Sequence, residues 1–164
     1  MNGRRSHELE VEPGRIVRRF TEDESLQLAE RWIGVYARDA LGANIKAYLW
    51  HTFSSGSYPS VCKSEAHDRY LRQAVTEVVA LSNDRRSAWL IADALPIRCN
   101  FTDFCVFPLN LAWTMAFTHE DGWLGPYFAT HPDYRALVAQ DIEQHRARQR
   151  KARELERARR EGWV

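Results

Sequence analysis

The sequence predicts an α+β domain with a mainly antiparallel sheet of about five strands, an N-terminal helix, one inserted helix and a long C-terminal helix. Two apolar segments, at 77–82 and 87–94, are joined by the turn-forming residues NDRR and so predict a hairpin. Apolar residues recur at helical spacing before this hairpin and again after residue 132. A chain of 164 residues, 45% of them hydrophobic, can bury a core of its own, so we expect a single domain.

The first helix is expected over residues 22–40. Thr21 and Glu24 have the spacing of a capping box, and Gly42 provides an end for the helix. Its apolar stripe consists of Leu28, Trp32, Val35 and Tyr36, widened by Leu26 and Ile33. Two further helices are expected, over 63–74 and 132–158.

Strands are expected near residues 46–53, 77–82, 87–93, 103–107 and 112–118, with a further short strand considered over 15–20. In the last of the five, three large apolar residues alternate with smaller ones, as in a strand with two different faces. The large ones are Trp113, Met115 and Phe117, and the smaller ones are Thr114, Ala116 and Thr118. The segment 46–53 is rich in aromatic and β-branched residues, which favours a strand, while a helix stays open as the alternative.

The charges are unevenly distributed along the chain. The formal net charge is only +1, yet residues 146–164 contain 8 of the 23 Lys and Arg residues and 3 of the 22 Asp and Glu residues. We therefore expect a single α+β domain over residues 1–145, with an acidic excess, and a mostly basic helical extension over 146–164. Contact with nucleic acid is expected, if at all, only through the basic tail 146–160.

The three cysteines, Cys62, Cys99 and Cys105, are an odd number without CxxC spacing, which favours free, buried thiols in a reducing compartment. The N-terminal segment lacks the apolar region of a signal peptide, and no apolar stretch is long enough to span a bilayer. These features predict a soluble cytoplasmic protein with no membrane partner.

Three segments support a resemblance to a known family: YLWHTF at 48–53, WTMAFTHE at 113–120 and GPYF at 125–128. With them the chain resembles a family of small uncharacterised bacterial proteins, a domain of unknown function that shares YLWHxF, WTxxFTHE and GPYF segments. The resemblance extends over roughly residues 44–129. It implies the same α+β fold and no particular activity.

The stretch FTHEDGWLGPYF, at 117–128, is the strongest candidate for a functional surface. Its Asp-Gly turn and Gly-Pro bend are expected to position aromatic side chains, because these residues favour sharp changes of chain direction. The predicted binding surface consists of Tyr48, Trp50, Trp123, Tyr127 and Phe128. Aromatic anchors of this kind commonly contribute most of the energy of binding.

His119 is expected to be a structural residue that hydrogen-bonds a neighbouring backbone carbonyl. The alternative is a catalytic site in which His119 is a general base, Glu120 orients it and His51 lies close by. The alternative requires an irregular strand end, because adjacent residues of a regular strand point to opposite faces.

No metal site and no cofactor are expected, because the chain contains no HExxH, GxGxxG or P-loop pattern, and it has no GxSxG nucleophile motif either. The function predicted from the sequence is that of a small cytoplasmic protein that binds another protein and has no catalytic activity. An immunity or inhibitor protein with an acidic surface for a basic toxin is the specific role considered. The alternative function is a hydrolytic or metal-dependent enzyme that uses His51, His119 and Glu120.

Overall fold

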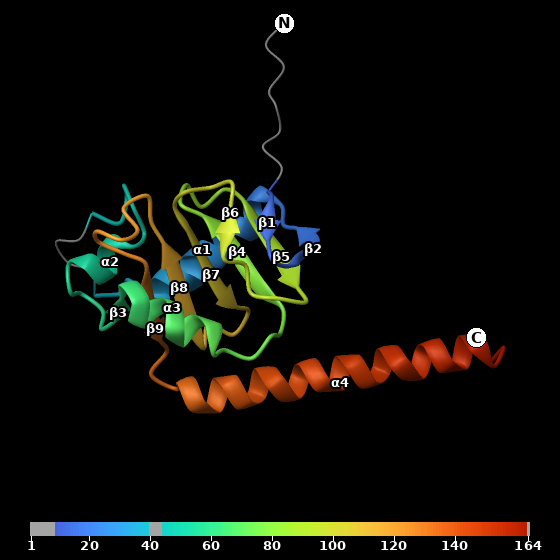
Figure 1. Ribbon diagram of the computed structural model, residues 1–164. Helices are drawn as coiled ribbons and strands as arrows, with labels where there is room; N and C mark the ends of the chain where they lie inside the picture. Colours follow the sequence, from blue (N-terminus) through green and yellow to red (C-terminus); the bar gives the residue numbers. More distant parts are fainter. Residues whose placement is uncertain (1–8, 40–43, 164) are drawn as a thin grey trace, which may run out of the picture.

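A computed structural model describes residues 9–39 and 44–163 and contains an antiparallel sheet of seven strands (Figure 1). The strands lie in the order β2-β5-β4-β7-β8-β9-β3, and every neighbouring pair is antiparallel. They are β2 Arg15–Arg19, β3 Val61–Cys62, β4 Val78–Ser82, β5 Ala88–Ala92, β7 Phe104–Pro108, β8 Trp113–Phe117 and β9 Tyr127–Thr130. A separate small pair joins β1 Val11–Glu12 to β6 Arg98–Cys99. The predicted fold class is confirmed.

Helices lie on both faces of this sheet. α1 (Glu22–Tyr36) and the short α2 (His51–Ser54) pack on one face. α3 (Lys63–Leu71) and the first turns of α4 (Tyr134–Arg160) pack on the other, so the domain has three layers. Figure 1 shows α1 behind the sheet, α3 in front of it, and α4 running past the body of the domain.

Because both faces are covered, the central strands are buried along their whole length. Every residue of β4, β7 and β8 is buried. The alternation predicted for 112–118 is confirmed, since Trp113 and Met115 contribute to the core beneath α3 while Ala116 contributes to the core beneath α1.

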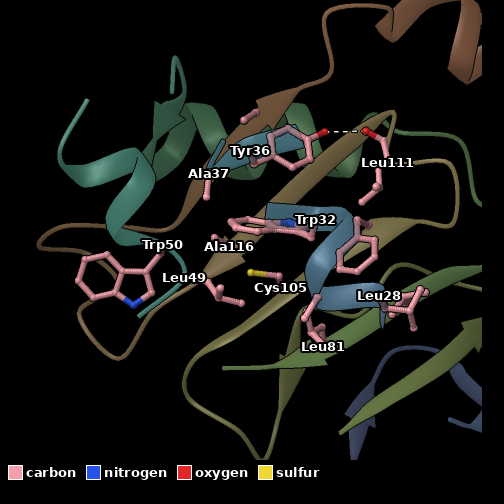
Figure 2. Close-up of a cluster of buried hydrophobic side chains, with 14 of the residues drawn as sticks. Leu28, Trp32, Tyr36, Ala37, Leu49, Trp50, Leu81, Cys105, Leu111 and Ala116 are labelled. Carbon is pink, nitrogen blue, oxygen red and sulfur yellow. Dashed lines mark hydrogen bonds between the residues drawn. The ribbon is translucent and has the colours of Figure 1, made fainter. Parts of the chain in front are cut away.

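The core beneath α1 is organised around two aromatic residues whose polar atoms are satisfied (Figure 2). Trp32 is fully buried, and its indole Nε1 donates a hydrogen bond to the Thr114 hydroxyl at 2.9 Å. The Tyr36 hydroxyl donates to the carbonyl oxygen of Leu111 at 2.7 Å. Each bond joins α1 to the sheet or its loops, so these aromatic residues fix the position of the helix as well as filling space.

Two local predictions are confirmed in detail. Thr21 caps α1, because its hydroxyl accepts a hydrogen bond from the Glu24 backbone N–H at 3.2 Å. The predicted hairpin is β4 and β5, with Val78 opposite Ile91, and its turn is tightened by a hydrogen bond from the Ser82 hydroxyl to Asp84. Both features depend on residues that are close together in the sequence.

The strand predicted at 46–53 is wrong, because this segment forms turns followed by α2. Leu49, Trp50 and Phe53 are buried together in the core beneath α1, which is a helical spacing rather than an alternating one. The Leu49 backbone N–H donates to Asn83 Oδ1, and Asn83 Nδ2 donates to the Ala47 carbonyl. A side chain from the β4–β5 turn therefore satisfies backbone groups that a strand would have paired with another strand.

The other differences concern the extent of the elements. Four of the five predicted strands form, and the short strand considered over 15–20 is β2. The strands β9 and β3, at one edge of the sheet, were not predicted, and they bring the sheet to seven strands rather than about five. α1 ends at Tyr36 instead of residue 40, while Gly42 lies outside the described residues. α3 ends at Leu71, three residues before the predicted end.

α4 is continuous across the boundary expected between residues 145 and 146, and none of its described side chains is fully buried. Its first half contacts the domain through Tyr134, Leu137 and Val138, and Asp141 accepts a hydrogen bond from the Thr76 hydroxyl at 2.7 Å. Among the helices of residues 9–39 and 44–163, none is apolar over a length sufficient to cross a membrane.

All three cysteines are free, as predicted, but the burial expected for all of them is found only for Cys105 and in part for Cys99. Cys62 is exposed, whereas burial raises the pKa of the Cys99 thiol to about 11 and the pKa of the Cys105 thiol further still. Because the thiolate is the reacting species, iodoacetamide is expected to modify Cys62 first in the native protein and Cys105 only after unfolding in urea. Peptide mapping by mass spectrometry checks the order, which rapid labelling of Cys105 in the native state would contradict.

Candidate functional site

The loop that follows β8 is held by the side chains of Thr118 and Asp121. The Asp121 carboxylate oxygen Oδ1 accepts hydrogen bonds from the Thr118 backbone N–H and from its hydroxyl, both at 2.9 Å. The Thr118 hydroxyl in turn accepts from the Glu120 backbone N–H at 3.0 Å. Residues 118–125, called the Trp123 loop below, therefore begin with a fixed conformation.

The rest of the Trp123 loop is closed by backbone hydrogen bonds. The Glu120 carbonyl accepts from the N–H groups of Trp123 and Leu124 at 2.9 Å, and the Gly122 N–H donates to the Gly125 carbonyl at 2.9 Å. Gly122 has a φ of +91°, as expected for the predicted Asp-Gly turn. A Cβ atom on Gly125 would lie only 2.9 Å from Thr118 Cγ2, so the tight packing of this loop requires a glycine there.

The tip of the loop exposes apolar surface. The Trp123 side chain is 77% exposed and that of Leu124 is 39% exposed. Glu120 Oε1 lies 3.7 Å from Nε2 of the adjacent His119, and half-exposed Glu120 adds a carboxylate to the same loop. The tip therefore presents an indole ring and acidic groups on a backbone with a defined shape.

His119 pairs with Asp103, a residue that precedes β7. The carboxylate oxygen Oδ1 of Asp103 lies 2.9 Å from His119 Nδ1, and it also accepts from the His119 backbone N–H at 3.1 Å. The indole Nε1 of Trp50 donates to the same carboxylate oxygen at 3.0 Å. This arrangement favours a proton on His119 Nδ1, with Nε2 directed toward Glu120.

The pair shifts the ionisation of both partners. The hydrogen bond to Asp103 raises the pKa of His119, against a smaller opposing effect of burial. Burial opposes the ionisation of Asp103, but the hydrogen bonds from His119 and Trp50 together outweigh it and lower the pKa of Asp103. The charged pair is therefore favoured in weakly acidic solution.

Aromatic rings connect the two histidines of the predicted site. Tyr48 stacks on Trp50 with ring centroids 5.4 Å apart, and His119 lies 5.0 Å from Tyr48. His51 lies 4.5 Å from Trp50, edge to face, and its Nδ1 is 2.8 Å from the Asn44 carbonyl oxygen. Both histidines thus contact the same two rings, but each has its own hydrogen-bond partner.

The predicted aromatic binding surface needs correction. Trp50, Tyr127 and Phe128 are buried, with 4%, 7% and 2% of their surface exposed, so they are core residues and not a rim. Tyr127 and Phe128 are buried because GPYF leads into β9, which lies between β8 and β3 in the sheet. Trp50 is buried because it directly precedes α2 and packs in the core beneath α1. Of the five residues predicted, Trp123 is exposed and Tyr48 is half-buried.

Asp103 was not predicted as the partner of His119, for which a backbone carbonyl or Glu120 was expected in that role. A signal was available, because the predicted strands 103–107 and 112–118 form a hairpin. The observed register places Phe104 opposite Phe117, so the residues just outside this pair, Asp103 and Thr118, lie at the same end. His119 follows directly and reaches the carboxylate.

Across residues 9–39 and 44–163, no group of three or more His, Cys, Asp or Glu side chains is arranged to hold a metal ion. The Asp103–His119 pair joins the Trp123 loop to the residue that precedes β7. The chemistry that this pair can perform is proton transfer at the His119 Nε2 atom.

Together these features define a three-layer α+β domain with a fixed, tryptophan-bearing loop that also supplies the histidine of an Asp–His pair. The chain belongs to the family described as "Domain of unknown function (DUF4275)", whose model matches residues 21–128. The match extends from the cap of α1 into β9 and includes the Trp123 loop, while β2 and α4 lie outside it. A comparison with curated proteins found no match, and neither did a comparison with solved structures.

Proposed function

We propose that this chain is a protein-binding domain without catalytic activity and that the Trp123 loop is its contact element. The observation that supports this most strongly is that Trp123 is 77% exposed on a loop whose backbone is held by hydrogen bonds. Tryptophan is the residue type most enriched at binding hot spots. A loop that is already ordered loses little conformational entropy when a partner binds, so more of the interaction energy appears as affinity.

The charge near the tip indicates the chemistry of the partner. Glu120 and Asp121 precede Trp123 by three and two positions in the sequence, and the chain outside residues 146–164 has 19 acidic residues against 15 basic ones. A partner with an apolar pocket bordered by Lys or Arg would match this surface. More specifically, we propose an inhibitor or immunity protein that neutralises a basic enzyme. The small size of the domain and its acidic excess support this role.

The test compares two exposed tryptophans. Trp123→Ala is expected to weaken partner binding by about 2 kcal/mol, or roughly thirtyfold, because the hot-spot ring is lost. Trp163→Ala is the matched control, since Trp163 is 79% exposed at the far end of the chain. Proteins captured from a bacterial lysate by each variant are identified by mass spectrometry, and the affinity of the recovered partner is then measured by calorimetry.

Unchanged melting temperatures are expected for both variants, because neither ring is packed in the core. The proposal is supported when the Trp123 variant alone loses the partner. Recovery of the same proteins in the same amounts by wild type and Trp123→Ala would contradict it.

The second candidate function is hydrolytic catalysis with His119 as a general base, and one observation favours it. Asp103 holds the His119 Nδ1 atom at 2.9 Å, which leaves Nε2 available to accept a proton from a substrate or a water molecule. In this candidate Asp103 replaces Glu120 as the orienting residue. His119→Gln separates the two functions: a folded variant that still binds its partner but has lost its effect in cells supports catalysis.

A further inference from the structure

Five arginines form a single row along the second half of α4. They are Arg146, Arg150, Arg153, Arg157 and Arg160, at alternating spacings of four and three residues. With 3.6 residues per turn, these positions fall within about 80° of one another on the helix surface and extend over about 21 Å. This set of five is called the arginine row below.

The arginine row is fully accessible. All five residues are exposed, and α4 contacts the body of the domain through its first half, at Leu137, Val138 and Asp141. Figure 1 shows the C-terminal part of α4 extending away from the domain. The acidic excess of the body therefore does not cover these guanidinium groups.

The positive charge of this segment is only partly compensated. Residues 146–160 contain eight basic and two acidic residues. Three ion pairs form along the helix: Arg150–Glu143, Arg157–Glu161 and Arg160–Glu156. All three are exposed to solvent, where an ion pair contributes little to stability and its members stay available to other charged groups. Among the described residues, Arg146 and Arg153 have no carboxylate within ion-pair distance.

We infer that the arginine row binds the phosphate backbone of a nucleic-acid duplex. A straight row of guanidinium groups is complementary to a ligand that carries closely and regularly spaced anions, and a duplex carries one phosphate per about 1.7 Å of its axis. The planar guanidinium group binds phosphate oxygens through two parallel hydrogen bonds, which favours arginine over lysine at such contacts.

Two further considerations favour a duplex backbone over a single strand and over a second copy of this helix. The row contains no aromatic side chain, so it offers no platform for stacking the bases of a single strand. A second copy of the same helix would present like charges and would be repelled. The inference is independent of the proposed protein-binding function, since α4 lies outside the residues 21–128 that the family model matches.

The test uses the full chain and a fluorescein-labelled DNA duplex of about 20 base pairs, with an RNA duplex in parallel, followed by fluorescence anisotropy. We expect a dissociation constant in the micromolar range at about 50 mM KCl, and a slope of log K against log salt near −4.5, because each of five phosphate contacts contributes about −0.9. Binding to either duplex supports the inference.

Two triple variants remove the same charge from different sides of α4. The row variant carries Arg146→Gln, Arg150→Gln and Arg153→Gln, while the control carries Arg148→Gln, Lys151→Gln and Arg159→Gln on the opposite side. We expect the row variant to bind at least about tenfold more weakly than wild type and to reduce the magnitude of the salt slope by about 2.7. The control is expected to keep a slope close to that of wild type.

Circular dichroism verifies that both variants keep their helix, as expected from the similar helix propensities of Arg and Gln. An equal loss of duplex affinity in the two variants would overturn the inference, because it would show that the total charge of the helix rather than the arginine row determines binding. Absence of duplex binding at about 50 mM KCl, with binding of polyglutamate instead, would also overturn it and assign the row to an acidic protein.

Discussion

Replacement of Trp32 by alanine is expected to lower the free energy of unfolding by about 3–5 kcal/mol, which would leave a domain of this size barely folded. Trp32 is fully buried, and its ring lies 5.4 Å from the ring of Tyr36 and 5.8 Å from that of Phe53. The substitution leaves a large cavity and removes the donor to the Thr114 hydroxyl. Urea denaturation followed by circular dichroism measures the loss.

Two controls separate the causes of this loss. Trp32→Phe keeps most of the buried apolar volume but removes the indole N–H, so a smaller loss of about 1–3 kcal/mol is expected. Leu26→Ala changes a side chain on the same helix that is 39% exposed, and it is expected to lower the free energy of unfolding by no more than about 1 kcal/mol, because it lies outside the fully buried core. A loss below about 1 kcal/mol for Trp32→Ala would contradict the packing described for α1.

Replacement of Asp103 by alanine is expected to cost about 2–3 kcal/mol, since it removes the acceptor of several hydrogen bonds at once. The Asp103 side chain is only 13% exposed. The Trp50 indole N–H, the His119 backbone N–H and the His119 ring all lose their partner. Asp68→Ala, at an exposed position of α3, serves as the control and is expected to change stability little.

This loss is also expected to depend on pH. The pKa of His119 is raised above its ordinary value of 6.5, so the contribution of the pair is complete below that pH and is lost as the pH rises through the folded-state pKa. The pKa of Asp103 is lowered below its ordinary value of 3.8, so its contribution is complete above that pH and is lost as the pH falls through the lower folded-state pKa.

The difference in stability between the native chain and Asp103→Ala is therefore expected to be greatest between pH 3.8 and pH 6.5. Denaturation curves measured across this range and above it check the expectation. A difference that stays constant from acidic to alkaline pH would show that His119 and Asp103 do not share a proton in the folded protein.

The sequence alone determined those features that depend on neighbouring residues. Thr21 caps α1 through the N–H of Glu24, three residues away, and the β4–β5 hairpin forms around the Asn-Asp turn. The alternation of large and small residues in 112–118 correctly assigned both faces of β8. The Asp-Gly turn in the Trp123 loop was predicted too, because Gly122 adopts a positive φ on local grounds.

Only the tertiary structure decided which secondary structure the two aromatic segments, YLWHTF and GPYF, adopt. YLWHTF has the composition of a strand, but a side chain 34 residues away, Asn83, takes the Leu49 N–H and so stabilises a turn. GPYF reads as a loop, but Tyr127 and Phe128 enter the interior of the sheet because β8 and β3 are both available to pair with them.

The Asp103–His119 pair has the same origin, since its two residues are 16 positions apart and meet only through the register of β7 and β8. Caps and turns are stabilised by groups that are close along the chain, so a sequence pattern reveals them. Strand pairing, burial and side-chain pairs depend on which distant segments compete for the same backbone groups, and folding of the whole chain decides that competition.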